Sequence, residues 1–350
     1  MNSSNRLDRI IWPEQMDILC KENPFIASYY LKRISSIIQL KSVDKKVIPD
    51  LKNEIRLFAI MRNESLRLPH FINYYKNLGV DRFIIIDNNS SDLSVEIALS
   101  YDNVHVFATN DSYTNHWCWM QYLLSAYGRN RWCVVVDIDE LFYFPSIEKL
   151  SIRQLCLFLE ETNCTAFRSF LLDLYSETSI NDVKYLVGED PLNVLKYFDE
   201  HYDEIEFIFF DHHQWQPFKS ISFTGGMRDR IFGKHAPPHL LSKISLFKHE
   251  NGSYLAQGMH AINGSKVSDL QGAVLHTKFL NDFVSEVEEE CAREEHYGKA
   301  VYYKSYKREI NKNHDLMLQN NGSVQLIDSA QLVELGIMKT NKVFKDFFNL

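Results

Sequence analysis

Residues 133–145, CVVVDIDELFYFP, decide the fold class of this 350-residue chain. The segment opens with a run of β-branched apolar residues, which is typical of a buried strand. It continues directly into three carboxylates, Asp137, Asp139 and Glu140. Because side chains alternate along a strand, Asp137 and Asp139 are predicted to address one point at the carboxyl edge of a sheet. Carboxylates held this close favour a cation between them. The expected occupant is Mg²⁺ or Mn²⁺ bridging to a phosphorylated substrate.

The bulk composition is that of a soluble globular protein, with 45% hydrophobic and 24% charged residues. The formal net charge of −8 argues against a nucleic-acid-binding protein, which normally carries a basic surplus. The six cysteines show no CxxC pair and are expected to be reduced thiols in a cytoplasmic protein. No secretory signal and no transmembrane segment is predicted from the apolar pattern.

An alternation of strands and helices runs outward from this stretch on its N-terminal side. The predicted strands cover residues 55–61, 80–86, 104–108 and 133–136. The predicted helices cover residues 65–78, 93–100, 117–127 and, after the stretch, 152–161. This order predicts an α/β protein with a mostly parallel sheet flanked by helices. Further strands are expected at residues 166–172 and 273–279, and one long amphipathic helix at residues 282–312.

Polar clusters follow three of the predicted strands, at residues 62–64, 87–92 and 137–140. Ligands bind outside the carboxyl ends of strands in an open α/β sheet, so three such clusters together predict a ligand site. The alternative is that they cap loops and helices. Asp87 directly follows an apolar strand and does not precede a helix, which favours ligand contact for this residue.

Five segments together carry a family resemblance. In chain order they are FAIMRNES, FIIIDNNSSD, VVVDIDELFYFP, GGMRDRIF and AVLHTKFL, spread over about residues 54–310. Their order and spacing resemble bacterial glycosyltransferase family 2-like proteins and, more distantly, family 92. The resemblance implies a GT-A fold, which is a Rossmann-like sheet that binds a nucleotide sugar through a DxD metal motif. It also implies helical N- and C-terminal extensions.

The resemblance assigns roles to residues that bind the donor and the metal. Asp87 would contact the nucleoside, and Asp137 the ribose or a metal-bound water. Asp139 would bind Mn²⁺ or Mg²⁺ directly, and His276 would complete a metal site with Asp137 and Asp139. An imidazole beside carboxylates suits Mn²⁺ better than Mg²⁺. For His276 the alternative is a buried histidine satisfied by the backbone.

Further residues are expected around the donor and the acceptor. Donor contacts are predicted for Asn63, Glu64, Asn89 and Arg228, the last because a guanidinium pairs well with a diphosphate. A surface arginine after a glycine turn is the alternative for Arg228. The base for the acceptor hydroxyl is predicted to be Asp173 or Asp229, with the pair at 189–190 left open. Trp215 and Phe218 are expected to stack on the acceptor sugar.

The domain organisation expected from the pattern along the chain has three parts. Residues 1–50 form a helical extension, residues 51–280 the catalytic domain, and residues 281–350 a helical segment. Within the catalytic domain, residues 51–145 form the nucleotide-sugar half. Residues 146–280 form the acceptor half, with an insertion at 176–222.

The function implied is metal-dependent, inverting transfer of a hexosyl group from a nucleotide sugar, such as a UDP-sugar, to a glycan hydroxyl. The acceptor would be an oligosaccharide or a lipid-linked glycan in bacterial surface polysaccharide or lipooligosaccharide biosynthesis. Residues 282–312 could bring a cytoplasmic enzyme to the membrane surface. One alternative is a haloacid-dehalogenase-like Mg²⁺-dependent phosphatase, which also has DxD after an apolar strand. Another is a non-catalytic carbohydrate-binding protein on the same fold.

Overall fold

A single nine-stranded sheet forms the centre of the protein in the computed structural model, which describes residues 34–211, 216–250, 252–256 and 259–350. Its strands, in chain order, are β1 (Lys41–Ser42), β2 (Arg56–Met61), β3 (Arg82–Asp87), β4 (Val104–Ala108), β5 (Trp132–Val135), β6 (Glu140–Tyr143), β7 (Ala166–Asp173), β11 (Ser242–Lys248) and β14 (Val267–His276). The spatial order is β1-β4-β3-β2-β5-β11-β7-β14-β6. Strands β2, β3, β4, β5, β7 and β14 run in one direction, and β1, β6 and β11 run against them. The predicted α/β class with a mostly parallel sheet is confirmed.

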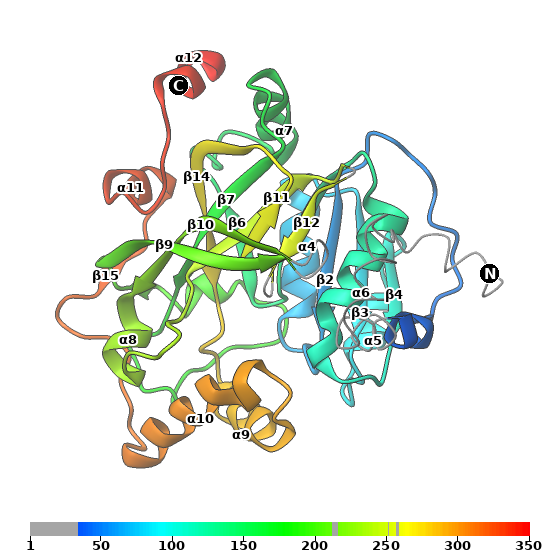
Figure 1. Cartoon of the computed structure of the whole chain (residues 1–350). Helices are drawn as coiled ribbons and strands as arrows, with labels where there is room; N and C mark the ends of the chain where they lie inside the picture. The colour runs from blue at the N-terminus through cyan, green and yellow to red at the C-terminus, as the bar shows by residue number, and fades with distance from the viewer. Residues whose placement is uncertain (1–33, 212–215, 251, 257–258) are drawn as a thin grey trace.

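Helices cover both faces of the N-terminal half of the sheet (Figure 1). They are α4 (Leu68–Leu78), α5 (Ser94–Leu99), α6 (His116–Leu123) and α7 (Ile152–Glu161), with short turns η1 (Tyr113–Asn115) and η2 (Leu124–Gly128). Alternate residues of β2 point to opposite faces of the sheet. Leu57 belongs to the hydrophobic cluster that contains Tyr75 of α4, and Phe58 belongs to the cluster that contains Trp119 of α6. Burial of one such side chain stabilises the fold by about 1.5–3 kcal/mol. Helix α4 ends at Gly79, whose φ of 107° allows the left-handed cap that the sequence predicts.

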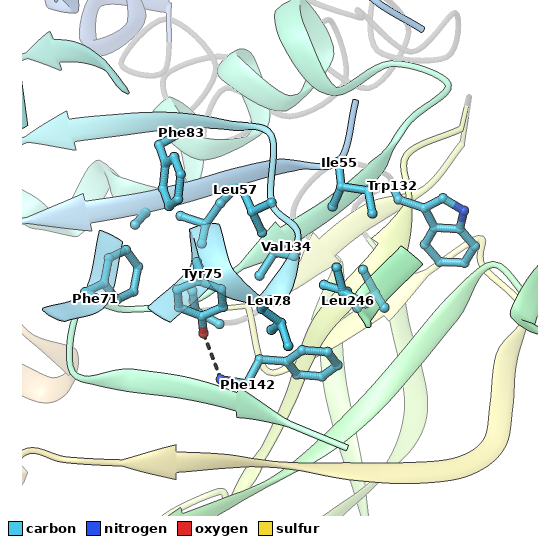
Figure 2. Packing of buried hydrophobic residues seen from close by; sticks show 14 of the residues in the cluster. Ile55, Leu57, Phe71, Tyr75, Leu78, Phe83, Trp132, Val134, Phe142 and Leu246 are labelled. Atoms are coloured by element: carbon cyan, nitrogen blue, oxygen red, sulfur yellow. Dashed lines mark hydrogen bonds between the residues drawn. The ribbon is translucent and has the colours of Figure 1, made fainter. Parts of the chain in front are cut away.

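The hydroxyl of Tyr75 connects this core to the acidic segment 137–140. It donates to the carbonyl of Glu140 at 2.8 Å and accepts from the N–H of Phe142 at 2.8 Å (Figure 2). Tyr75 is fully buried. The start of β6 is therefore fixed against α4 at the point where the carboxylates emerge.

The C-terminal half of the sheet is mixed. Strand β11 lies antiparallel between β5 and β7, and β6 returns antiparallel to β14. The predicted insertion at 176–222 contains the turn η3 (Pro191–Asn193), β8 (Tyr197–Phe198) and most of a long hairpin of β9 (Tyr202–Asp211) and β10 (Gln216–Gly225). Helix α8 (Gly226–Phe232) follows the hairpin. Two short ladders pair β12 (Tyr254–Ala256) with β13 (Ala261–Asn263), and β8 with β15 (Val324–Gln325).

The predicted long helix at 282–312 is wrong, because two helices occupy this region. Helix α9 (Phe283–Arg293) ends at Glu294, which has a left-handed φ of 52°. Helix α10 (Tyr297–Lys312) has positive φ angles at 298–300. The two helices pack side by side below the sheet (Figure 1). The chain ends with α11 (Ser329–Glu334) and α12 (Lys342–Phe348).

Other predictions concern the N-terminus, the membrane and the cysteines. Residues 34–39 are helical, and the rest of the predicted helical extension before them lies outside the described residues. Within the described ranges, no helix is both long and apolar enough to cross a membrane. The five described cysteines are free thiols, as predicted, and Cys20 lies outside this part of the chain.

Candidate functional site

A cavity of about 440 Å³ lies where β2, β5 and β14 end. The loops after these strands supply one side of it, including residues 61–64, 137–140 and 276–278. Helices α9 and α10 supply the opposite side. The carboxyl edge of the sheet is where an open α/β fold places its ligands. The C-terminal helices therefore take part in the site.

The structure brings Asp139 and His276 together from positions 137 residues apart in sequence, with 3.1 Å between Oδ2 of Asp139 and Nε2 of His276. Both side chains are largely buried and both line the cavity. Asp139 lies in the turn between β5 and β6, and His276 is the last residue of β14. Lys278 approaches the same Oδ2 at 4.0 Å. Burial opposes ionisation of Asp139, but His276 and Lys278 hold its pKa well below its usual range.

A second carboxylate orients the ring of His276. Oδ1 of Asp173, the last residue of β7, lies 2.6 Å from Nδ1 of His276. Arg228 of α8 holds the same carboxylate through two bonds of 2.6 and 2.7 Å. Burial opposes protonation of His276, but Asp139 and Asp173 raise its pKa to about 9. Asp173 is not among the described residues that line the cavity, whereas Arg228 is. Asp173 thus lies behind His276, away from the predicted position of a base.

Asp137 turns to a different partner from Asp139. The N–H of Glu140 bonds to the carbonyl of Asp137 at 3.1 Å, so residues 137–140 form a turn and not the extended strand assumed for the alternation argument. Nζ of Lys243 lies 2.6 Å from Asp137 and 2.7 Å from Glu140. Burial raises the pKa of Glu140 to about 7 against the attraction of Lys243, and the two carboxylates raise the pKa of Lys243 despite its burial. A lysine therefore sits beside the first carboxylate of the motif.

Asn63 and Glu64 follow β2 and line the cavity. The loop after β3 holds them in place. Ser90 Oγ accepts from the N–H of Asn63 at 3.0 Å, and Ser94 Oγ accepts from the N–H of Glu64 at 2.7 Å. Two of the three predicted polar clusters, after β2 and after β5, thus reach the cavity.

Asp87 and Asn89 instead shape the loop itself. The carboxylate of Asp87 accepts from the N–H of Ser90 at 3.3 Å, and Asn89 has a left-handed φ of 61°. The carbonyl of Asn89 accepts from Arg62 at 2.9 Å. Neither Asp87 nor Asn89 is among the described cavity-lining residues. In this structure they perform the loop-capping role that the sequence left as the alternative to donor contact.

Helix α9 presents carboxylates to every basic side chain near the β2 end of the cavity. Arg67 makes two bonds of 2.7 Å to Asp282. Lys278 bonds to Glu286 at 2.5 Å. Arg62 bonds to the third carboxylate, Glu289, at 2.8 Å. These pairs were not predicted, because they join residues more than 200 positions apart or lie on helix faces that sequence alone reads as solvated.

The other end of the cavity is aromatic. Tyr302 and Tyr306 of α10 line it together with His239, which precedes β11. The ring centroids of His239 and Tyr302 lie 4.1 Å apart. The hydroxyl of Tyr302 donates to the carbonyls of residues 237 and 238. Tyr297 and Tyr303 also line the cavity, so four tyrosines of α10 face it, and membrane contact of this region stays a prediction.

Asp229, the second predicted base, lies behind His239 and is not one of the described lining residues. Its Oδ1 is 4.0 Å from Nδ1 of His239, and burial raises its pKa. Of the residues expected to stack on an acceptor, Trp215 lies outside the described residues. Phe218 lies in β10 beside a separate surface hollow of the hairpin.

The pair of Asp139 and His276 fits a divalent cation. Two ligands about 2.1 Å from a six-coordinate ion, at right angles, lie about 3.0 Å apart. The 3.1 Å separation of Oδ2 and Nε2 is close to this value, but here it is a direct ion pair, and a cation would have to displace the proton on Nε2. Asp173 on Nδ1 supplies the outer carboxylate that usually orients a metal-binding histidine. No cluster of three or more His, Cys, Asp or Glu side chains suited to a metal occurs in the described part of the chain.

Comparisons with known proteins give a distant relationship. The chain matches no protein-family model. It is similar to glycosyltransferase family 92 proteins of three plants. The identity is 29% over 128 residues for Arabidopsis thaliana, 31% over 100 residues for Oryza sativa subsp. japonica, and 29% over 126 residues for Ricinus communis. These matches cover 33%, 26% and 33% of this chain, and 21%, 16% and 20% of the relatives. The chain thus spans about a fifth of the length of the curated relatives it matches.

These distant homologues agree with the family 92 part of the predicted resemblance, while the family 2-like part stays a prediction. Among solved structures, the chain is similar to glucosyl-3-phosphoglycerate synthase from Mycobacterium tuberculosis in complex with Mn²⁺, uridine diphosphate and glucosyl-3-phosphoglycerate. The similarity has a TM-score of 0.25 at 15% identity. It covers 34% of this chain and 44% of the other.

Proposed function

We propose that this chain is a metal-dependent glycosyltransferase of the GT-A type. It would transfer a hexosyl group from a nucleotide sugar, a UDP-sugar in the first instance, to a hydroxyl of a glycan. The observation that carries the proposal is the meeting of Asp139 and His276 at the carboxyl edge of the sheet, inside a cavity. The distant relationship to glycosyltransferase family 92 proteins supports the reaction class.

Asp139 and His276 would hold Mn²⁺ or Mg²⁺ in this proposal. When bound, the ion would supply Lewis-acid neutralisation of the leaving diphosphate. Asp173 keeps the ring of His276 in position through Nδ1, so that Nε2 faces Asp139. Lys243 holds Asp137 at the cavity wall, where its second oxygen can reach a ribose or a metal-bound water.

The donor nucleoside would lie at the β2 end of the cavity, against Asn63 and Glu64. Arg62, Arg67 and Lys278 surround this end and are paired with carboxylates of α9. A diphosphate can exchange with those carboxylates because it offers the same acceptor geometry with more charge. Arg228 remains next to His276, where it adds positive charge near the leaving group.

Inverting transfer requires a base for the acceptor hydroxyl on the side opposite the leaving group. Asp173 is poorly suited, since Arg228 and His276 saturate it and hold its pKa far below the usual value against the effect of burial. Asp229 lies 4.0 Å from His239 and is not one of the described cavity-lining residues either, so we assign the base to neither predicted acid. A glycan acceptor of the bacterial surface and a cytoplasmic location stay predictions from the sequence.

The test is a screen of UDP-, GDP-, CMP- and dTDP-sugars for thermal stabilisation and for release of free nucleotide, with Mn²⁺, Mg²⁺ or EDTA. A true donor raises the melting temperature through binding to the folded state. We expect at least one nucleotide sugar to stabilise the protein only when the metal is present. Equal behaviour of every nucleotide sugar with metal and with EDTA would refute the proposed function.

A further inference from the structure

His239 is the most unusual polar side chain of the cavity. It is 3% exposed and lines the cavity, yet neither of its ring nitrogens has a hydrogen-bond partner within the described residues. Buried polar groups nearly always have a partner, because leaving one unpaired loses the hydrogen bonds it made to water. A group of this kind beside a cavity indicates that a ligand supplies the missing contacts.

The charge state of His239 specifies which ligand fits. Burial, with the nearby Arg228 guanidinium, lowers the pKa of His239 to about 3. The ring is therefore neutral, with one N–H donor and one lone-pair acceptor. An anion prefers a charged donor, whereas a hydroxyl group both donates and accepts.

Aromatic rings surround His239 and complete a surface suited to a sugar. Tyr302 lies 4.1 Å away by ring centroids, and Tyr306 is stacked at 6.2 Å. Tyr297 is 63% exposed at the edge of the same group, 6.0 Å from Tyr302. Tyrosine rings offer apolar faces for the C–H groups of a sugar ring, while neighbouring polar groups bind its hydroxyls.

His239 lies close to the Asp139–His276 pair. Arg228 lies 3.1 Å from His276 and also helps to lower the pKa of His239. Helix α8 and the segment before β11 pack against Tyr302 and Tyr306 of α10. A sugar bound at His239 would therefore lie next to the proposed metal and leaving group.

We propose that His239, Tyr302 and Tyr306 form the subsite for a neutral acceptor sugar, in which His239 binds one hydroxyl group. The inference rests on the proposed function and names the acceptor class for it. Asp229 acts as a positioning residue here. When its Oδ1 closes the 4.0 Å gap to Nδ1, the proton is fixed on Nδ1, and Nε2 accepts the hydrogen bond of the sugar O–H.

The test uses saturation-transfer NMR with the methyl glycosides of glucose, galactose, mannose and N-acetylglucosamine on the full chain with UDP and the diamagnetic ion Mg²⁺. We expect wild type to bind at least one of these glycosides. His239→Ala should weaken that binding about tenfold, the usual upper effect of one neutral hydrogen bond. His239→Gln, which keeps a neutral donor and acceptor, should recover most of it. UDP affinity should stay within about twofold, because the neutral ring of His239 offers no charged donor to the diphosphate.

His249 provides a matched control. It is also buried, has an unpartnered Nδ1 and a pKa lowered to about 4 mainly by burial, but it is not one of the described cavity-lining residues. His249→Ala should leave glycoside binding unchanged. Binding that is unaffected by His239→Ala, lost equally in both variants, or absent for all four glycosides in the wild type overturns the subsite. If UDP with Mn²⁺ does not bind to wild type, the proposed function is overturned. Glycoside binding is measured independently of UDP binding, so the two failures can be told apart.

Discussion

Replacement of Lys243 by methionine tests the buried charge cluster beside the acidic turn. Lys243 and Glu140 each expose 2% of their side chains, whereas Asp137 exposes 36%. Removal of one partner from a buried ion pair costs about 3–5 kcal/mol, because the other charge remains in the interior. The more exposed Asp137 can regain water, so its bond adds little to this cost. We therefore expect Lys243→Met to lose about 3 kcal/mol of the free energy of unfolding.

The assay is thermal unfolding followed by circular dichroism. With an unfolding entropy of about 2.1 cal/mol/K per residue, a 350-residue chain loses about 4 °C of melting temperature for 3 kcal/mol. The loss should depend on pH. Burial raises the pKa of Glu140 to about 7 even with Lys243 present, so removal of the lysine raises it further. In wild type, folded Glu140 has lost its proton above about pH 7, so its effect on stability no longer changes with pH. In the variant, Glu140 keeps its proton to a higher pH, so stability continues to fall above about pH 7. The difference between the two proteins should widen as pH rises.

Lys248→Met is the matched control on the same strand. Lys248 also pairs with a glutamate, at 3.0 Å, but the two side chains expose 31% and 42%. A pair this exposed contributes about 0–1 kcal/mol, so its loss should change the melting temperature by about 1 °C or less. Equal effects of the two substitutions, or a loss for Lys243→Met that does not change between pH 6 and 9, would refute the reasoning.

Three further predictions concern Asp139 in the candidate site, Glu54 before strand β2, and Tyr75 in the core. Asp139→Asn should reduce release of UDP from a donor more than about 100-fold in a protein that still folds but melts at a lower temperature, because a buried ion pair with His276 is lost, and an unreduced rate argues against a metal ligand at this position. Glu54 binds Arg56 and Arg82, and these bonds lower the pKa of Glu54 despite its burial. The ionised carboxylate therefore stabilises the fold above about pH 4.5, and this stabilisation is lost as the pH falls below that value. In an acid titration, Glu54→Gln should lose less stability over that range than wild type. Tyr75→Phe removes both bonds to the start of β6 and should cost about 1–3 kcal/mol in urea unfolding, with an unchanged midpoint as the contrary result.

The N-terminal half of the fold could be predicted from sequence because its signals are local. Strand β4 and helix α7 have the predicted bounds. Helix α7 begins with a capping box between Ser151 and Gln154, and α4 ends at Gly79 in the left-handed conformation. Apolar runs such as Arg56–Met61 are buried throughout, which is the pattern of a strand covered on both faces.

The C-terminal half was harder because its arrangement depends on contacts between distant segments. The break at Glu294 has neither glycine nor proline to mark it, and only the packing of α9 against α10 explains it. Strand β11 follows β7 in sequence by about 70 residues yet inserts between β5 and β7. No local pattern encodes that insertion.

In the candidate site, too, residues in local motifs could be predicted from sequence, whereas contacts between distant segments could not. The strand-end positions of Asp139 and His276 were readable from short motifs, and the structure brings them together. Lys243 was missed because a lysine in a strand is usually read as solvent-facing, and its buried partner Glu140 lies 103 residues away. His239 was missed because a single histidine before a strand carries no spacing signal. The donor contact predicted for Asp87 stays a prediction, and the structure shows its carboxylate bonded to the N–H of Ser90.

The most direct test of the central claim is the binding of Mn²⁺ itself, followed by loss of the free-ion signal in electron paramagnetic resonance with UDP present. Wild type should bind a single ion tightly. His276→Gln and Asp139→Asn should each weaken binding at least about tenfold, because each removes one of two protein ligands. Unchanged Mn²⁺ affinity in both variants would contradict the account.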